Sequence, residues 1–151
     1  MQLPRIKKIV AFACGSLVLP YDLASINEIS AVQHAIMLTL RDCLAAKQPG
    51  TSIEYRAQDI DYSDVDKQVL GEVGIATVDD PYGFLEVDED TVVFAQYPSV
   101  PICQIIADIA RPAMMIWRKI GPEPPRFGVM CVIIASGTPP WIIRLTMTSC
   151  C

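Results

Sequence analysis

Short apolar runs alternate with polar, turn-rich connectors along the first 117 residues of the chain. Residues 6–13 form a nearly continuous apolar run, which is typical of a strand buried on both faces of a parallel sheet. Further apolar runs predict strands at residues 52–57, 75–78, 91–95 and 113–117. Gly15-Ser16 ends the first strand, and a linker is expected between it and the first helix.

The longest helix is predicted to begin at Ser25 or Asn27, either of which can cap it, and to end near residue 46 before Pro49 and Gly50. Its apolar residues recur at three- and four-residue steps, so they predict one buried face. The residues expected on that face are Ile29, Val32, Ile36, Leu40 and Cys43.

Two shorter helices follow. The second is expected to begin after a Ser63 cap, with Asp64 and Asp66 complementing the helix dipole, and to end at Gly74. The third spans residues 102–110, and Pro112 prevents its continuation. The predicted buried positions are Val65, Val69, Leu70 and Val73 in the second helix, and Ile105, Ile106 and Ile109 in the third. Phe84 and Leu85 are expected to tuck under the turn at 79–83.

The order of these elements is strand, helix, strand, helix, strand, strand, helix, strand. Such an order predicts an α/β fold, namely a Rossmann-like doubly wound, mostly parallel sheet of about five strands with flanking helices. The alternative at the N-terminus is a signal peptide, because Arg5, Lys7 and Lys8 precede an apolar run. The lack of a small-x-small cleavage site directly after this run favours the strand. No apolar run approaches the ~18 residues of a membrane-spanning helix.

A Gly- and Pro-rich linker at 121–125 divides the chain into an α/β domain, residues 1–120, and an apolar tail, residues 121–151. Two interpretations of the tail stay open. Its apolar runs predict either a hairpin at the sheet edge or a terminus without a well-patterned fold.

Composition narrows the function classes. The net charge is −5 and the basic cluster at residues 5–8 is small, which argues against nucleic-acid binding. Acidic residues between Asp59 and Asp90, including Asp64 and Asp66, predict a solvated acidic face. The chain is 52% hydrophobic and 19% charged, so an apolar surplus exists that either a partner surface or a missing piece of the fold would explain. Its six cysteines form no CxxC pair, which suits a reducing compartment and gives no zinc site.

Candidate chemistry lies at the predicted strand ends, where α/β folds bind ligands. Gly15 and Ser16 follow the first strand and Asp59 follows the second, so backbone N–H groups and a carboxylate are available to a nucleotide-like ligand. A tight turn and helix capping explain the same residues, since both the GxGxxG and the P-loop patterns are absent.

His34, the single histidine, is either a general base or a packed helix residue. Cys14 and Ser16 do not lie in a GxSxG elbow. The cluster Asp59, Asp61, Asp64 and Asp66 lacks the glycine of a calcium loop.

Several stretches resemble the SRR-like ("sensitivity to red light reduced") domain family, with patterns similar to its fungal members. They are FACGSL, SAVQHAIML with Gln33, DVDKQVLGEVGI, DDPYGFLEVDEDTVVFA and YPSVPICQIIADIARPAMMIW, between about residues 8 and 120. Asp59-Ile60 departs from the Asp-Pro usual in the family, and the tail does not resemble it.

The resemblance implies a regulatory protein of the cytoplasm or nucleus, because family members are associated with light signalling and clock output in plants. The resemblance supplies no catalytic mechanism, and it leaves open whether the domain binds a cofactor. The main hypothesis is therefore a non-enzymatic interaction domain with a protein partner; the alternative is a domain that binds a nucleotide or S-adenosylmethionine-like molecule, or a transferase. The candidate ligand-binding residues are Gly15, Ser16, Gln33, Asp59 and Pro98. The motif and turn positions are Asp80, Pro81, Pro101, Asp108, Arg111 and Pro112.

Overall fold

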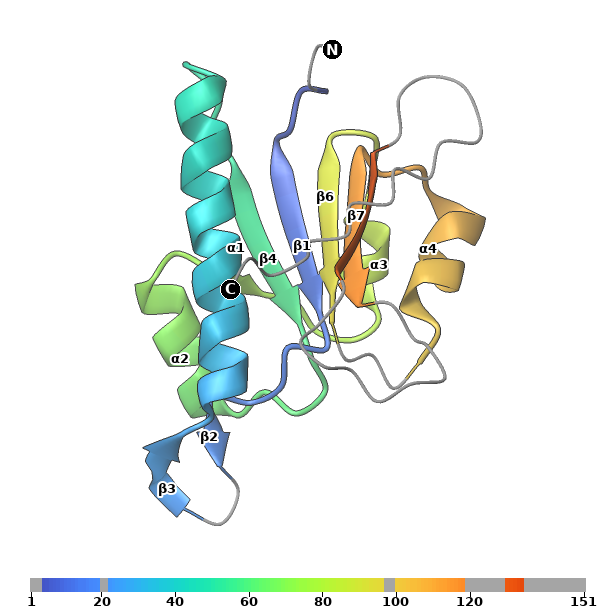
Figure 1. Cartoon of the computed structure of the whole chain (residues 1–151). Helices are drawn as coiled ribbons and strands as arrows, with labels where there is room; N and C mark the ends of the chain where they lie inside the picture. The colour runs from blue at the N-terminus through green and yellow to red at the C-terminus, as the bar shows by residue number, and fades with distance from the viewer. Residues whose placement is uncertain (1–3, 20–21, 97–99, 119–129, 135–151) are drawn as a thin grey trace, which may run out of the picture.

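The computed structural model describes residues 4–19, 22–96, 100–118 and 130–134 (Figure 1). The strands are β1 (Lys8–Phe12), β2 (Val18–Leu19), β3 (Asp22–Ile26), β4 (Glu54–Gln58), β5 (Ala76–Thr77), β6 (Thr91–Ala95), β7 (Met114–Arg118) and β8 (Met130–Ile134). The helices are α1 (Glu28–Lys47), α2 (Asp64–Glu72), α3 (Tyr82–Leu85) and α4 (Ile102–Ile109).

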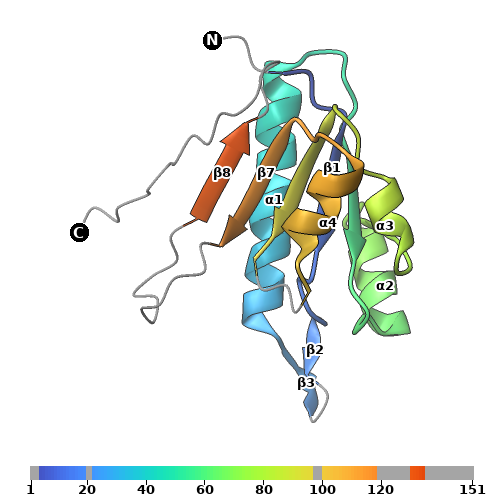
Figure 2. The same ribbon diagram turned by 90° about the vertical axis from the view of Figure 1, so that its right-hand side faces the viewer.

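The main sheet has the strand order β5-β4-β1-β6-β7-β8. Its first five strands are parallel, and β8 pairs antiparallel with β7. Figures 1 and 2 show α1 and α2 over one face of the sheet and α3 and α4 over the other. The chain winds outward from β1 to β5, then crosses to β6 and winds outward the other way. The predicted doubly wound α/β fold is thus confirmed.

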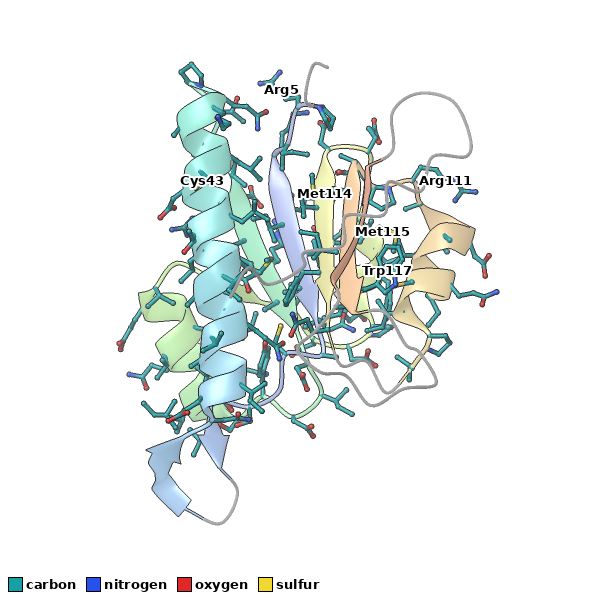
Figure 3. The ribbon with its side chains drawn as sticks, viewed as in Figure 1. Arg5, Cys43, Arg111, Met114, Met115 and Trp117 are labelled. Atoms are coloured by element: carbon teal, nitrogen blue, oxygen red, sulfur yellow. The ribbon has the colours of Figure 1, made fainter. Side chains whose placement is uncertain are left out.

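Both faces of β1 are buried, which explains its continuous apolar run. Ile9 and Ala11 pack into the core beneath α1 and α2, and Val10 and Phe12 pack into the core beneath α3 and α4. Phe12 stacks on Phe84 with ring centroids 4.8 Å apart. Figure 3 shows that Met115 and Trp117 lie on the α4 side of β7.

The predicted buried face of α1 is wrong for four of its five residues, since only Leu40 packs against the core. Ile29, Val32 and Ile36 are 63%, 55% and 42% exposed, and Cys43 points outward from the helix (Figure 3). The helix is rotated because polar residues on its inner side find hydrogen-bond partners in the loops and strands beneath it. The residues that it buries are Ser30, Gln33, His34, Met37 and Leu44.

The buried positions predicted for the other helices are confirmed only in part. In α2, Leu70 is buried as predicted, but Asp66 takes a second inner position and leaves Val65, Val69 and Val73 exposed. In α4 the buried residues are Ile102 and Ile106, whereas Ile109 is 55% exposed. Leu85 is 76% exposed and does not tuck under the turn, although the half-buried Phe84 does.

Strands also form in the predicted linker, where none was expected, and in the predicted tail, where an edge hairpin was one of the two open interpretations. The predicted linker after β1 contains the small β2–β3 hairpin, which projects beyond the carboxyl ends of the main strands (Figure 1). Residues 130–134, in the predicted tail, form the edge strand β8. The second apolar run of the tail lies outside the described residues.

Candidate functional site

The carboxyl ends of β1 and β6 mark the point where the winding of the sheet changes direction. Ligands of open α/β sheets bind outside such a switch point. A cavity of about 270 Å³, largely open to solvent, lies here between α1 and the residue that follows β6. Its lining residues are Glu28, Ile29, Val32, Gln33, Ile36 and Gln96.

Gln33 is the polar residue that this cavity leaves unsatisfied. Its side chain is 3% exposed, and its Oε1 has no hydrogen-bond partner among the described residues. The helix that holds it is fixed at its start, because Asn27 caps α1 and Ser30 Oγ donates to the carbonyl of Gly15 at 2.6 Å. A buried carbonyl oxygen without a donor is unfavourable by about 1–3 kcal/mol, so a ligand donor would be stabilised here.

Gly15 and Asp59 are brought together, but they bind each other. The Gly15 N–H donates to Asp59 Oδ2 at 2.7 Å, and Asp59 Oδ1 accepts the N–H of Asp61 at 2.9 Å. Gly15 has a φ of +77°, which glycine adopts without strain. With its carbonyl accepting from Ser30, both backbone polar groups of Gly15 are used within the fold.

Ser16 is tied to Asp66 at the start of α2. Its Oγ lies 2.9 Å from Asp66 Oδ2, and the fully buried Asp66 also accepts the N–H groups of Leu17 and Ser63, each at 2.7 Å. Burial alone would raise the pKa of Asp66, but the hydrogen bonds from Ser63, Ser16 and Leu17 outweigh it and hold this pKa below its usual range. Asp66 is thus part of the framework and does not belong to a solvated acidic face.

His34 lies buried between two tyrosines beneath α1. Its Nδ1 is 2.7 Å from Tyr55 Oη, and its Nε2 is 3.1 Å from Tyr62 Oη. Burial lowers the pKa of His34 to about 4 and raises the pKa values of both tyrosines. Burial, with the nearby charge of Asp59, raises the pKa of the Cys14 thiol to about 12. These groups form a neutral packed cluster, as the packed interpretation of His34 predicted.

The motif and turn positions do not line the cavity. Asp80 Oδ1 accepts a bond from Gln58 Nε2 at 2.8 Å, beside Pro81 at the start of α3. Pro101 precedes α4, Asp108 is exposed on it, and Arg111 Nη1 donates to the carbonyl of Ala110 at 2.8 Å after it. Pro112 is buried, and Pro98 lies outside the described residues.

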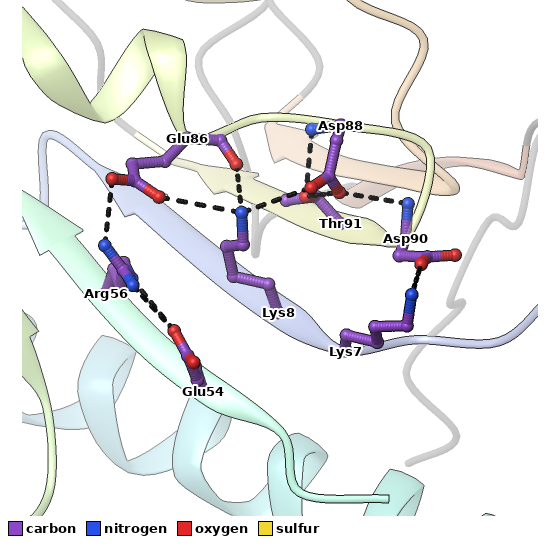
Figure 4. A network of polar contacts seen from close by, with 8 residues as sticks. All are labelled: Lys7, Lys8, Glu54, Arg56, Glu86, Asp88, Asp90 and Thr91. Atoms are coloured by element: carbon purple, nitrogen blue, oxygen red, sulfur yellow. Dashed lines mark hydrogen bonds and ion pairs between the residues drawn. The ribbon is translucent and has the colours of Figure 1, made fainter.

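A charged network lies at the opposite ends of the strands (Figure 4). Lys8 Nζ donates to the carbonyl of Glu86 at 2.6 Å and contacts Asp88 Oδ2 at 3.2 Å, while Arg56 pairs with Glu86 at 2.8 Å. Lys7 pairs with Asp90 at the same end. Part of the predicted acidic face is therefore neutralised by cations from β1 and β4.

Two lining residues, Glu28 and Gln96, were missed by sequence reasoning. Gln96 directly follows β6 as the Cys14-Gly15 turn follows β1, so the strand-end rule applied to every strand would have found it. Nothing in the sequence marked Glu28, whose role depends on the rotation of α1. Within the described ranges, no cluster of His, Cys, Asp and Glu could hold a metal ion, and no helix is long and apolar enough to cross a membrane.

The model of the SRR1 domain family matches residues 1–122 of the chain. No curated protein sequence and no solved structure matches it significantly. The family match covers most of the 151 residues and includes β1 to β7 and all four helices. The chain therefore belongs to the SRR1 domain family.

Proposed function

We propose that this domain is a non-enzymatic regulatory domain that acts by binding a protein partner through α2. The observation that carries this proposal is an exposed apolar row on the helix. Val65, Val69 and Val73 are 56%, 42% and 48% exposed and follow one another at four-residue steps, so they lie along one side of α2. We call these three residues the α2 valine row.

The chemistry around the row favours a basic amphipathic helix as the partner. Asp64, Gln68 and Glu72 are exposed beside the row, while Lys67 pairs with Asp79 at 3.2 Å. A helix with apolar residues at matching steps would bury the valines, and its flanking Lys or Arg residues would meet the carboxylates. The chain's net charge of −5 strengthens the attraction for such a partner.

The reactive side chains support binding over catalysis. Ser16 is hydrogen-bonded to Asp66, His34 lies between two tyrosines, and the Cys14 thiol is buried with a raised pKa. A nucleophile needs an adjacent base and an open approach, which these arrangements do not offer.

Affinity capture with the full chain tests the proposal. Asp64→Lys with Glu72→Lys reverses the exposed charges, and Val69→Ser interrupts the valine row; none of the three positions is buried. We expect both variants to lose a partner that the wild type retains, and a synthetic peptide from that partner's basic helix to bind the wild type alone. Ile109→Ser, on the exposed side of α4, is the matched control. Recovery of no partner, or of partners equally retained by all variants, would contradict the proposal.

A small-molecule site at the switch point is the second candidate function. The cavity beside β6 favours it, and Gln33 is the predicted ligand-binding residue that lines this cavity.

The proposed location of the protein is the cytoplasm or nucleus, which imaging of the tagged full chain would test.

A further inference from the structure

We propose that the cavity between α1 and Gln96, the α1–β6 cavity, binds a small apolar molecule that carries an N–H or O–H donor and is neutral or positively charged. The inference rests on the second candidate function and specifies its ligand chemistry. It differs from the nucleotide expectation, because a phosphate is the group that this cavity is least suited to hold.

The need for a donor comes from Gln33. Its side chain is almost fully buried at the cavity, and Oε1 accepts no hydrogen bond from the described residues. Buried polar atoms in folded proteins are nearly always paired, so an orphan acceptor at a cavity indicates a group that arrives from outside. An amide oxygen is satisfied only by a donor, which sets the chemistry of that group.

The apolar requirement comes from the walls. Ile29, Val32 and Ile36 line the cavity although they are 63%, 55% and 42% exposed. A flat aromatic or branched aliphatic body would remove part of this surface from water, at roughly 25 cal/mol per Å². One polar anchor set in apolar walls is the usual plan of a small-molecule site.

The charge preference comes from Glu28. This residue is the one ionisable group among the six that line the cavity. It occupies the first turn of α1, where its carboxylate already complements the positive end of the helix dipole. The backbone N–H of Gly15, a group that could donate a hydrogen bond to a phosphate, already donates to Asp59. Among the described residues that line the cavity, an anion would thus meet a carboxylate and no cation, whereas an amine would be attracted.

Four matched fragments test these three requirements on the ¹⁵N-labelled full chain by NMR titration. Indole has an apolar body and one N–H, and benzothiophene is nearly the same shape without the donor. Tryptamine adds a positive charge to indole, and indole-3-acetate adds a negative one. The signals to follow are the backbone amides of Val32 and Gln33 and the side-chain amide of Gln33.

We expect indole to bind about fivefold more tightly than benzothiophene, the factor that corresponds to one ordinary hydrogen bond. Gln33→Met keeps the length of the side chain and removes the acceptor, so it should erase this preference while benzothiophene still binds. Gln104→Met, at an exposed position of α4, should leave it unchanged. Tryptamine should bind more tightly than indole-3-acetate, and Glu28→Gln should narrow that difference.

The outcomes separate two kinds of failure. In the first, the fragments shift the α1 signals while indole and benzothiophene bind with equal affinity, or while indole-3-acetate binds more tightly than tryptamine. Either result would mean that the proposed ligand chemistry is wrong and that the small-molecule site stands. If no fragment shifts these signals, the second candidate function fails together with this inference. A lower Tm of Gln33→Met than of wild type would also count against it, because it would mean that the fold itself satisfies Gln33.

Discussion

The backbone N–H of Gly15 donates to Oδ2 of Asp59 at 2.7 Å, across the carboxyl ends of β1 and β4. Asp59 thereby accepts from a backbone N–H group of the kind that binds a ligand phosphate in many α/β folds. Both residues were predicted as ligand-binding positions from their places after the strands. The structure shows that they come together, and it gives them a bond to each other.

Asp59→Ala removes the acceptor for the N–H groups of Gly15 and Asp61. We expect the free energy of unfolding to fall by about 1–3 kcal/mol, measured by urea denaturation, because both donors lose a charged partner. Asp61→Ala is the matched control: its side chain is exposed, and a change within about 0.5 kcal/mol is expected. Equal effects of the two substitutions would show that the Gly15–Asp59 bond contributes little and that Asp59 is available to a ligand.

Asp66→Asn should destabilise the protein by about 2–3 kcal/mol at neutral pH, since the new amide NH₂ faces the donors of Ser63 and Leu17. The folded-state pKa of Asp66 lies below the unfolded value of 3.8. Its ionised form therefore stabilises the fold above that value, and this contribution is lost as the pH falls through the folded pKa. The difference in stability between wild type and variant should accordingly shrink in acid, as followed by urea denaturation at several pH values. Asp64→Asn, at an exposed position, is the matched control and should change the stability at neutral pH by no more than about 0.5 kcal/mol.

His34 should titrate with a midpoint near pH 4, against 6.5 for a free imidazole, because its burial disfavours the charged form. In the unfolded chain the ring takes up its proton below about 6.5, whereas in the folded chain it stays neutral down to about 4. The unfolded state therefore binds more protons in this interval, and His34 lowers the stability as the pH falls through it. As the single histidine, its ring signals can be followed directly by NMR. A midpoint above 6 would mean that the ring is not held neutral between Tyr55 and Tyr62.

Gly83 and Gly71 should respond oppositely to alanine. A Cβ on Gly83 would clash with Gln58 Oε1, the atom that accepts the Gly83 N–H at 2.6 Å, and would stand 3.0 Å from Gln58 Cβ. Gly83→Ala should thus cost about 1–3 kcal/mol through overpacking. Gly71 lies within α2 with nothing within 4 Å of such a Cβ, so Gly71→Ala should stabilise by about 0.5–1 kcal/mol. Thermal unfolding of the two variants distinguishes these signs, and a Gly83→Ala variant as stable as wild type would contradict the close approach.

Met37 and Ile36 test which side of α1 faces the sheet. Met37 is 1% exposed, so Met37→Ala should lower the free energy of unfolding by about 2–5 kcal/mol. Ile36 is 42% exposed, so Ile36→Ala should lower it by less than about 1 kcal/mol. Urea denaturation of both variants provides the measurement. The reverse order would restore the face predicted from the sequence and remove the apolar wall of the α1–β6 cavity.

The sequence predicted the parts of the fold that depend on neighbouring residues. The buried parallel strand at β1 was evident from its apolar run, and Ser63 and Gly74 mark the ends of α2 as expected. Gly74 has a φ of +79°, the conformation that makes glycine suitable after a helix. The order of strands and helices was enough to predict the doubly wound sheet, because crossover connections allow few alternatives.

The rotation of the helices was decided by the tertiary structure. Periodicity shows that α1 has an apolar stripe, but Ser30 and His34 lie on another side and carry polar groups that must be paired once buried. Their partners are the carbonyl of Gly15 and the hydroxyls of Tyr55 and Tyr62, which come from distant segments of the chain.

The candidate site follows from the same rotation. By itself, the sequence determined the parallel strands of the main sheet, the three longer helices and their order. Only the packed structure turned Ile29, Val32 and Ile36 outward and buried Gln33 beside Gln96, where its Oε1 has no hydrogen-bond partner among the described residues. The physical reason is that burial and hydrogen bonding are settled between segments far apart in sequence, where no local spacing records them.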